Sequence, residues 1–500
     1  MTATPDASDA LDDRSFGARR RLAVWAVCVT LFVASTGQTI VSTALPVITA
    51  DLGGLNRISW VVTAYLLAST VGAPVFGKLG DLFGRKAVLQ SGLGVFTLGA
   101  LICGAAPSME VLIAGRAVQG LGGGGLIVVS MAVVADLYPA RERSRVQGAL
   151  GGVFGLSTVV GPLVGGLIVD AASWHWVFFA NLPVVALSFA VLQVALDAQG
   201  PRDRPRIDVA GAALLAAALS GLVLIASLGG IELGWDDPAL WSLIAATLAA
   251  TAGFVAVERR AAEPILPLSL FRLNAVAVVN GAGLLVGMAM FGTLTFLPLY
   301  LQVVRGVSPM GSGLYLLPMM AGLIGASMLA GRVMARTGRY KALPVASTAL
   351  LAVAMLGLSR IGPEMPLWQV VALMVATGLG IGPMMSVGVA AIQNAVPQRF
   401  LGVGTASANM FRLIGGSVGT SVFGALFAAG LARNLAGLVE GAGLGTIGRS
   451  AVMALPEAQR APVLAGFSEA LGPVFLTAAA IAALACAVTL RLREVPLAEG

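Results

Sequence analysis

The chain has 500 residues, of which 57% are hydrophobic and 11% are charged. A soluble domain usually carries about 25% charged residues, so this composition excludes an ordinary soluble protein and indicates a helical membrane protein with many spans. The formal net charge of +7 does not indicate a nucleic-acid partner, because the basic residues stand in short clusters between apolar runs.

The first predicted element is a polar segment, residues 1–21, in which acidic residues precede the arginines. A signal peptide has the opposite order, so we expect a disordered cytoplasmic tail and a first span that is retained. Fourteen apolar runs follow that are long enough to cross a bilayer. They predict an all-α integral membrane fold with spans at about 22–47, 57–76, 87–106, 111–135, 147–169, 175–196, 209–229, 239–257, 274–303, 311–331, 343–361, 367–391, 403–430 and 470–490.

Basic residues orient these spans. With the N-terminus inside, 23 of the 31 Lys and Arg residues fall in inner segments and six in outer loops, and the other two, Arg116 and Arg412, fall within spans. This bias predicts that both termini are cytoplasmic and that the long segment 431–469 is an outer loop. Arg outnumbers Lys 28 to 3, which is compatible with a GC-rich bacterial genome, so we expect a bacterial cytoplasmic membrane.

An internal repeat divides the chain. The stretch "GKLGDLFGRKAVL" at 77–89 recurs as "GRVMARTGRYKAL" at 331–343, in the inner loops after the second and tenth spans. The offset predicts two six-span halves, 22–200 and 263–491, with spans 7 and 8 inserted at 201–262 and a cytoplasmic tail at 492–500. Parallel repeats of this kind are typical of two bundles that move around a midplane site.

The repeated loop has the composition of a conformational lock. Gly77 and Gly84 permit a tight turn and a close helix approach. Asp81 can cap a helix and pair with Arg85 or with a neighbouring helix end. A charge pair of this kind can hold one conformation and be broken in another. An ordinary cytoplasmic loop is the alternative interpretation.

The spacing of this loop resembles the signature loop of the major facilitator superfamily. Further stretches resemble its fourteen-span drug:proton antiporter branch (EmrB/QacA-type exporters): "QTIVSTALPVI" in span 1, "LIAGRAVQGLGGGG" in span 4 and "GLSTVVGPLVGG" in span 5. The resemblance implies two six-helix bundles plus two inserted helices, and export driven by a proton gradient without another cofactor. It also implies that Gly161, Pro162, Gly165 and Gly166 form a packing motif that seals one side during exchange.

The resemblance gives roles to two further sets of residues. It implies that Arg116 orients a proton-exchanging carboxylate, although Gly37 stands where this branch commonly has an Asp. Coupling must then run through Asp51, Asp81 or Asp136 with Arg116, or be altered. By the same analogy, spans 1, 4, 9 and 12 and their neighbours line a substrate cavity, although a residue of this kind taken alone more often serves in packing. The candidates are Gln38, Thr39, Ser42, Thr43, Tyr65, Gln119, Asn280, Met288, Phe291, Tyr300 and Met384.

The two arginines within spans have alternative interpretations. An Arg at membrane depth is functional by default, and Arg116 is expected to act in coupling or substrate binding. The structural alternative is a hydrogen bond from Arg116 to carbonyls of span 1. Arg412 is expected near the inner end of span 13, where its side chain can snorkel. Every acidic residue falls outside or at the edge of the predicted spans, which favours neutral or anionic substrates over dications.

These patterns favour a secondary active exporter of small amphipathic or hydrophobic compounds. The alternatives are an exporter of lipids, glycolipids or one secondary metabolite, and a membrane sensor or scaffold that does not transport. The single histidine and the three cysteines without CxxC spacing predict no metal site, and no catalytic cluster is visible. The expected partners are the substrate and the lipid bilayer, and the chain is expected to be a monomer.

Overall fold

The computed structural model describes residues 7–52, 57–197, 208–229, 233–434 and 457–495. Most residues in these ranges are helical, and an isolated bridge joins Gly229 and Leu233. The chain divides into two compact units. The first unit comprises Met1–Pro139, Val160–Arg206 and Gln398–Ala406, and the second comprises Ala140–Val159, Ile207–Pro397 and Ser407–Gly500. Two long helices, α6 and α16, each contribute residues to both units.

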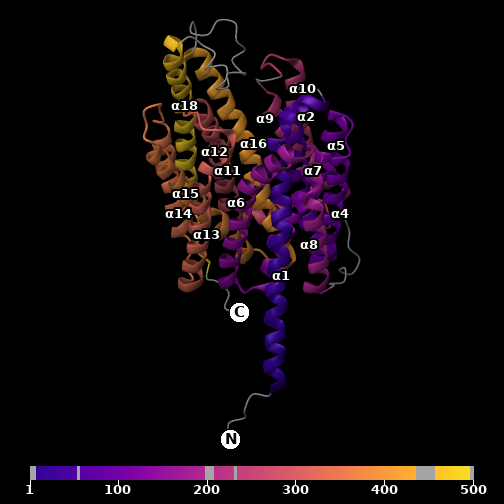
Figure 1. Ribbon diagram of the computed structural model, residues 1–500. Coiled ribbons are helices and arrows are strands. Elements are labelled where there is room, and N and C mark those ends of the chain that lie inside the picture. Colours follow the sequence, from indigo (N-terminus) through magenta and orange to yellow (C-terminus); the bar gives the residue numbers. More distant parts are fainter. Residues whose placement is uncertain (1–6, 53–56, 198–207, 230–232, 435–456, 496–500) are drawn as a thin grey trace. The chain divides into compact units, whose positions relative to one another are not determined.

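The first half of the chain supplies most of the first unit. Its helices α4, α5 and α8 lie side by side, and α1 packs along α5 and α8 (Figure 1). The elements are α1 (Ala7–Thr39), η1 (Ile40–Thr43), α2 (Leu45–Leu52), α3 (Ile58–Phe83), α4 (Arg85–Gly104), α5 (Met109–Leu137), α6 (Ala140–Ala171), α7 (Trp176–Phe179) and α8 (Asn181–Ala195).

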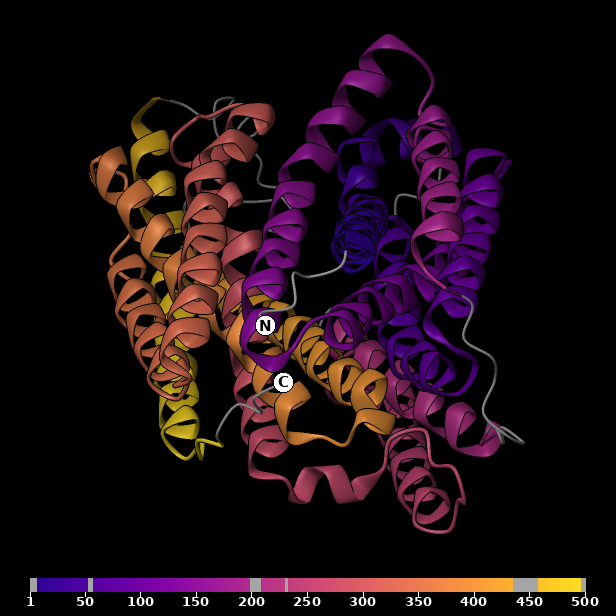
Figure 2. The same ribbon diagram turned by 90° about the horizontal axis from the view of Figure 1, so that it is seen from below.

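The remaining chain supplies most of the second unit, in which α14 and α18, orange and yellow in Figure 2, pack along each other. Its elements are α9 (Val209–Leu228), α10 (Pro238–Glu258), η3 (Leu268–Arg272), α11 (Asn274–Val303), α12 (Pro309–Tyr315), α13 (Leu317–Thr337), α14 (Ala342–Leu358), α15 (Leu367–Ala395), η4 (Gln398–Phe400), α16 (Leu401–Asn434) and α18 (Glu457–Leu490).

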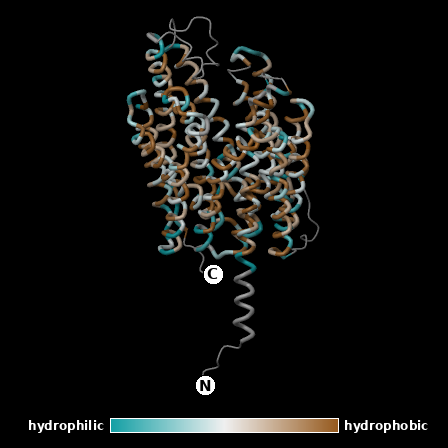
Figure 3. Tube along the Cα trace, viewed as in Figure 1, coloured by the Kyte–Doolittle hydropathy of each residue, from teal (hydrophilic) through white to brown (hydrophobic). Residues whose placement is uncertain are grey.

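Thirteen helical segments in the described ranges are long and apolar enough to cross a membrane. Figure 3 shows hydrophobic residues along these helices and hydrophilic residues gathered towards many helix ends. The predicted span 343–361 is the exception, because α14 is apolar but shorter, at 17 residues. The chain is therefore a multi-pass membrane protein, and the fourteen-span arrangement stays a prediction.

Several helix ends differ from the predicted ones. Helix α1 already begins at Ala7, so the segment expected to be a disordered tail is helical from that residue. The segment between the two last helices is also shorter than the predicted outer loop 431–469, because α16 continues to Asn434 and α18 begins at Glu457. Residues 435–456 of that loop lie outside the described residues.

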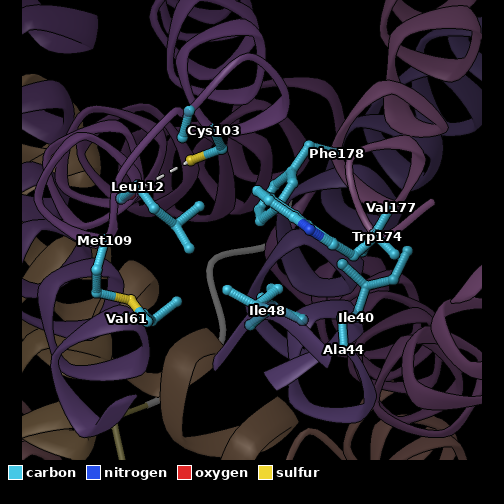
Figure 4. Close-up of a cluster of buried hydrophobic side chains, with 12 residues drawn as sticks. Ile40, Ala44, Ile48, Val61, Cys103, Met109, Leu112, Trp174, Val177 and Phe178 are labelled. Carbon is cyan, nitrogen blue, oxygen red and sulfur yellow. Dashed lines mark hydrogen bonds between the residues drawn. The ribbon is translucent and has the colours of Figure 1, made fainter. Parts of the chain in front are cut away.

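The first span is broken, whereas the apolar run 22–47 predicted one continuous helix. Helix α1 ends at Thr39, a 3₁₀ turn covers Ile40–Thr43, and α2 begins at Leu45. The broken segment is anchored by an apolar cluster of the first unit (Figure 4). Its fully or almost fully buried members include Ile40, Ala44, Ile48, Val61, Met109, Leu112, Trp174 and Phe178.

The signature stretch is a corner between two helices rather than the predicted loop. Helix α3 runs to Phe83 and α4 begins at Arg85, so Gly84 alone makes the turn, with φ of 89° and ψ of 150°. The repeat has a second glycine at the matching place: Gly338 ends α13 with φ of 67°. Both positions require a backbone conformation that side chains with a Cβ disfavour.

Candidate functional site

Arg116 of α5 is fully buried in the first unit. Its Nη1 donates to the carbonyl oxygen of Gly37 at 2.8 Å and to Oε1 of Gln119 at 2.7 Å, and its Nε donates to the carbonyl oxygen of Val61 at 3.1 Å. The guanidinium carbon lies 4.3 Å from the ring centroid of Tyr65, within the range of a cation–π contact. The Tyr65 hydroxyl in turn donates to the carbonyl oxygen of Ala34 at 2.7 Å.

The charge of Arg116 is compensated by the end of a helix. The last carbonyls of a helix have no intrahelical partner and form its negative end, and Gly37 lies in the last turn of α1. Arg116 therefore caps α1, which is the contact that the structural alternative predicted. No carboxylate bonds to Arg116 within the described residues, and Asp51 accepts instead from the indole Nε1 of Trp174 at 2.8 Å.

Gly37 leaves no space for the Asp that the resemblance led us to expect at this position. A Cβ built on Gly37 would lie 2.6 Å from Cζ of Phe96 and 3.7 Å from Nε2 of Gln119. The Phe96 ring, fully buried, thus fills the space into which a side chain at position 37 would extend. A side chain larger than that of glycine at this position would therefore require Phe96 to move.

The predicted packing motif of α6 lies against the broken part of span 1 through Gly161 and Gly165. A Cβ on Gly165 would lie 2.3 Å from the carbonyl oxygen of Ile40 and 2.7 Å from Oγ1 of Thr43. One on Gly161 would lie 2.2 Å from Oγ1 of Thr39. These glycines let α6 contact the 3₁₀ turn directly, so two of the motifs found in the sequence form one packed element.

Gly165→Ala is expected to destabilise the protein by about 1–3 kcal/mol, the usual range for overpacking a well-packed contact. The clash is with a backbone oxygen, which cannot rotate away. Gly166→Ala is the matched control, because nothing lies within 4 Å of its added Cβ. Thermal unfolding in detergent should show a lower midpoint for Gly165→Ala only. Equal midpoints for the two variants would contradict the proposed contact.

Asp81, Arg85 and Asp136 form an ion-pair network at the Gly84 corner. Nη2 of Arg85 lies 2.6 Å from Oδ1 of Asp81, and its Nε lies 2.8 Å from Oδ2 of Asp136. The Asp81 carboxylate also accepts from the backbone N–H groups of Gly402 at 3.0 Å and Val403 at 3.1 Å. These are the first turns of α16, so Asp81 caps this helix N-terminus. Both contacts suggested by the sequence are therefore present.

The corner contains an acid that lies deeper than the sequence predicted. Asp81 lies within α3 with a side chain 2% exposed, while Asp136 is 22% exposed. Gly77 permits the approach of α16, because its added Cβ would lie 2.9 Å from Cβ of Ala406. The second copy of the repeat has Ala335 where the first has Asp81, so the acidic cap belongs to one half only.

The predicted cavity residues have different surroundings. Thr43 is exposed, Gln38 and Thr39 are half-buried, and the side chain of Ser42 lies outside the described residues. In the second unit, Met288 and Met384 are buried, Phe291 is half-buried, and the buried Asn280 donates to Ser407 Oγ at 3.0 Å.

Tyr300 is not close to Asn280. Tyr300 lies twenty positions after Asn280 in α11, or roughly 30 Å along the helix at 1.5 Å per residue. Its hydroxyl donates to the carbonyl oxygen of Gly362 at 2.8 Å. Their shared role in substrate binding stays a prediction.

Two features of the structure were not predicted from the sequence. Arg412 does not snorkel but is 7% exposed inside α16. Gly402 and Val403 supply the N–H groups that bind Asp81, and backbone donors have no signal in a side-chain pattern. A glycine at the start of span 13 was the only available hint.

Known proteins resemble this chain over most of its length. A sequence profile of the Major Facilitator Superfamily matches residues 27–420. An uncharacterised MFS-type transporter of Mycobacterium tuberculosis is 42% identical over 484 residues, which cover 96% of this chain and 70% of that protein. The multidrug transporter protein MdtP of Bacillus subtilis is 37% identical over 413 residues, covering 82% and 76%. The solved structure of the proton:xylose symporter XylE aligns with a TM-score of 0.61 at 12% identity, over 94% of this chain and 95% of that one, and shows the fold alone.

Proposed function

Because the chain belongs to the major facilitator superfamily, we propose that it is a secondary active exporter of small amphipathic or hydrophobic compounds. It belongs, on this proposal, to the fourteen-span drug:proton antiporter branch, with α14 as the short fourteenth span and both termini in the bacterial cytoplasm. Transport proceeds by alternating access. The multidrug relative at 37% identity supports the substrate class.

The observation that carries the proposal is the network at the Gly84 corner. Asp81 binds both Arg85 and the N-terminus of α16, so it joins segments far apart in the sequence by contacts that one conformation can make and another can break. A scaffold that keeps one conformation has no need for a bond that opens. The buried network therefore favours a protein that cycles between conformations.

Proton coupling is the second part of the proposal. Arg116 has no carboxylate partner in the described residues, so the proton is exchanged at Asp81 or Asp136, whose carboxylates bond to Arg85. Protonation of Asp81 removes its attraction to Arg85 and weakens the cap on α16. The gradient thereby acts on the conformational equilibrium, and Arg116 positions span 1.

Flux into proteoliposomes tests the proposal. The full chain is reconstituted, the lumen is made acidic, and uptake of labelled chloramphenicol, benzylpenicillin and tetraphenylphosphonium is followed against protein-free liposomes. We expect the neutral or the anionic probe to accumulate faster under the gradient than without it. Flux that ignores the gradient would remove the coupling, and no flux of any probe would contradict the export of such compounds.

A further inference from the structure

A second buried arginine, Arg412 in α16, has fewer partners than Arg116. It is 7% exposed, and within the described residues its single hydrogen bond is to Oδ1 of Asn409, one turn earlier. The Phe154 ring centroid lies 5.6 Å from its guanidinium carbon. A guanidinium has five N–H donors, and the Nε of Arg412 is buried without an acceptor.

The surroundings of Arg412 offer donors and no acid. The Nδ2 of Asn409 is also buried without a partner, on the same amide whose oxygen accepts from Arg412. Helix α11 packs directly against this part of α16, because a Cβ on Gly287 would lie 2.3 Å from the carbonyl oxygen of Arg412, and α11 contains no Asp or Glu. No ion pair to Arg412 occurs in the described ranges of the chain.

A cation at membrane depth without a counter-ion is costly, and such charges usually pair or line a pathway. Arg116 bonds to a helix end and makes three hydrogen bonds, although its Nη2 is also buried without a partner, whereas Arg412 makes one hydrogen bond, to Asn409. We propose that Arg412 and Asn409 bind the anionic group, a carboxylate, sulfonate or phosphate, of a small-molecule substrate. The anion receives charge-assisted hydrogen bonds from Nε of Arg412 and Nδ2 of Asn409. This assignment rests on the proposed export function and specifies its substrate class.

Thermal unfolding of the purified full chain measures the site without transport. The probes are benzenesulfonate, which is anionic, and benzenesulfonamide, its neutral analogue. We expect benzenesulfonate to raise the unfolding midpoint of the wild type and to bind at least about tenfold more weakly to Arg412→Gln and to Asn409→Asp. In Asn409→Asp the new carboxylate pairs with Arg412, so this variant should also unfold at a higher temperature than the wild type without any ligand. Arg336→Gln, which removes an exposed arginine of α13, is the control and should bind as the wild type does.

Three results would overturn the assignment. One is an equal shift of the unfolding midpoint by benzenesulfonate in the wild type and in both site variants. Another is a site variant that weakens the binding of benzenesulfonamide as much as that of benzenesulfonate. The third is a shift produced by phosphatidylglycerol and by neither small probe, which would assign the site to a lipid headgroup. Should Arg412→Gln fail to fold, Asn409→Asp decides alone.

The transport assay separates this proposal from the export function. If chloramphenicol and benzylpenicillin both move and Asn409→Asp affects neither, the anion site fails while export stands. If benzenesulfonate binds as expected but no probe moves, export fails while the anion site stands. Selective loss of benzylpenicillin flux in Asn409→Asp, with chloramphenicol flux kept, supports both.

Discussion

Asp81→Asn is expected to reduce transport by about 100-fold, whereas Asp136→Asn should reduce it by less than about tenfold. On the proposal, the network stabilises one conformation of the transport cycle. Breaking this buried ion pair then destabilises that conformation by about 3–5 kcal/mol, and each 1.4 kcal/mol is about a factor of ten in its population. Asp81 is buried and holds both Arg85 and the N-terminus of α16. Asp136 is 22% exposed and, among the described residues, bonds to Arg85 alone, so solvent weakens its contribution. Probe flux into proteoliposomes, normalised to folded protein, measures the difference.

The same pair of variants separates a conformational lock from a structural contact. If the network holds one conformation of the cycle, Asp81→Asn changes the rate of flux by folded molecules. If it only stabilises the fold, the unfolding midpoint falls while flux per folded molecule stays at the wild-type value. Equal effects of the two substitutions on flux would contradict the ranking that burial predicts.

The chemistry of this corner could be predicted from the sequence, but its partner could not. Gly84 is repeated as Gly338 and favours a turn, and Asp81, which is not repeated, has the residue type of a helix cap. The cap acts on Gly402, which is 321 residues away, and a backbone N–H leaves no mark in a side-chain pattern. The length of the helices was also misjudged. Lys78 and Asp81 are polar, so the apolar run appeared to end at residue 76, although α3 continues to Phe83.

The break in span 1 shows a different limit. Hydrophobicity reports burial and not backbone dihedrals, so the run 22–47 gave no sign that α1 ends at Thr39. Pro46 was the available signal, because proline is favoured in the first turn of a helix, and α2 begins at Leu45. The break also explains what Gly161, Gly165 and the buried Arg116 have in common. All three contact the end of α1 or the 3₁₀ turn that follows it.

Arg116→Lys is expected to lose transport as fully as Arg116→Gln, by about 100-fold or more. The fork of Arg116 bonds to Gly37, Val61 and Gln119 at once, and a lysine ammonium is a point charge that cannot reproduce this planar geometry. Leaving the two buried carbonyls without a donor costs about 1–3 kcal/mol each. Span 1 should then lose its position, so gradient-driven uptake and exchange without a gradient should fall together.

A coupling role would produce a different pattern, which makes the two variants decisive. If the positive charge of Arg116 served mainly to set the protonation of a carboxylate, Arg116→Lys would keep gradient-driven uptake. Arg116→Gln would then retain exchange without a gradient and lose only the response to the gradient. The capping geometry argues for the first outcome, since the groups that Arg116 contacts are carbonyls, an amide and a ring. None of these groups releases a proton at neutral pH, so a proton that drives transport must bind elsewhere. On the proposal it binds to a carboxylate that pairs with Arg85, and Asp81→Asn and Asp136→Asn test these two carboxylates.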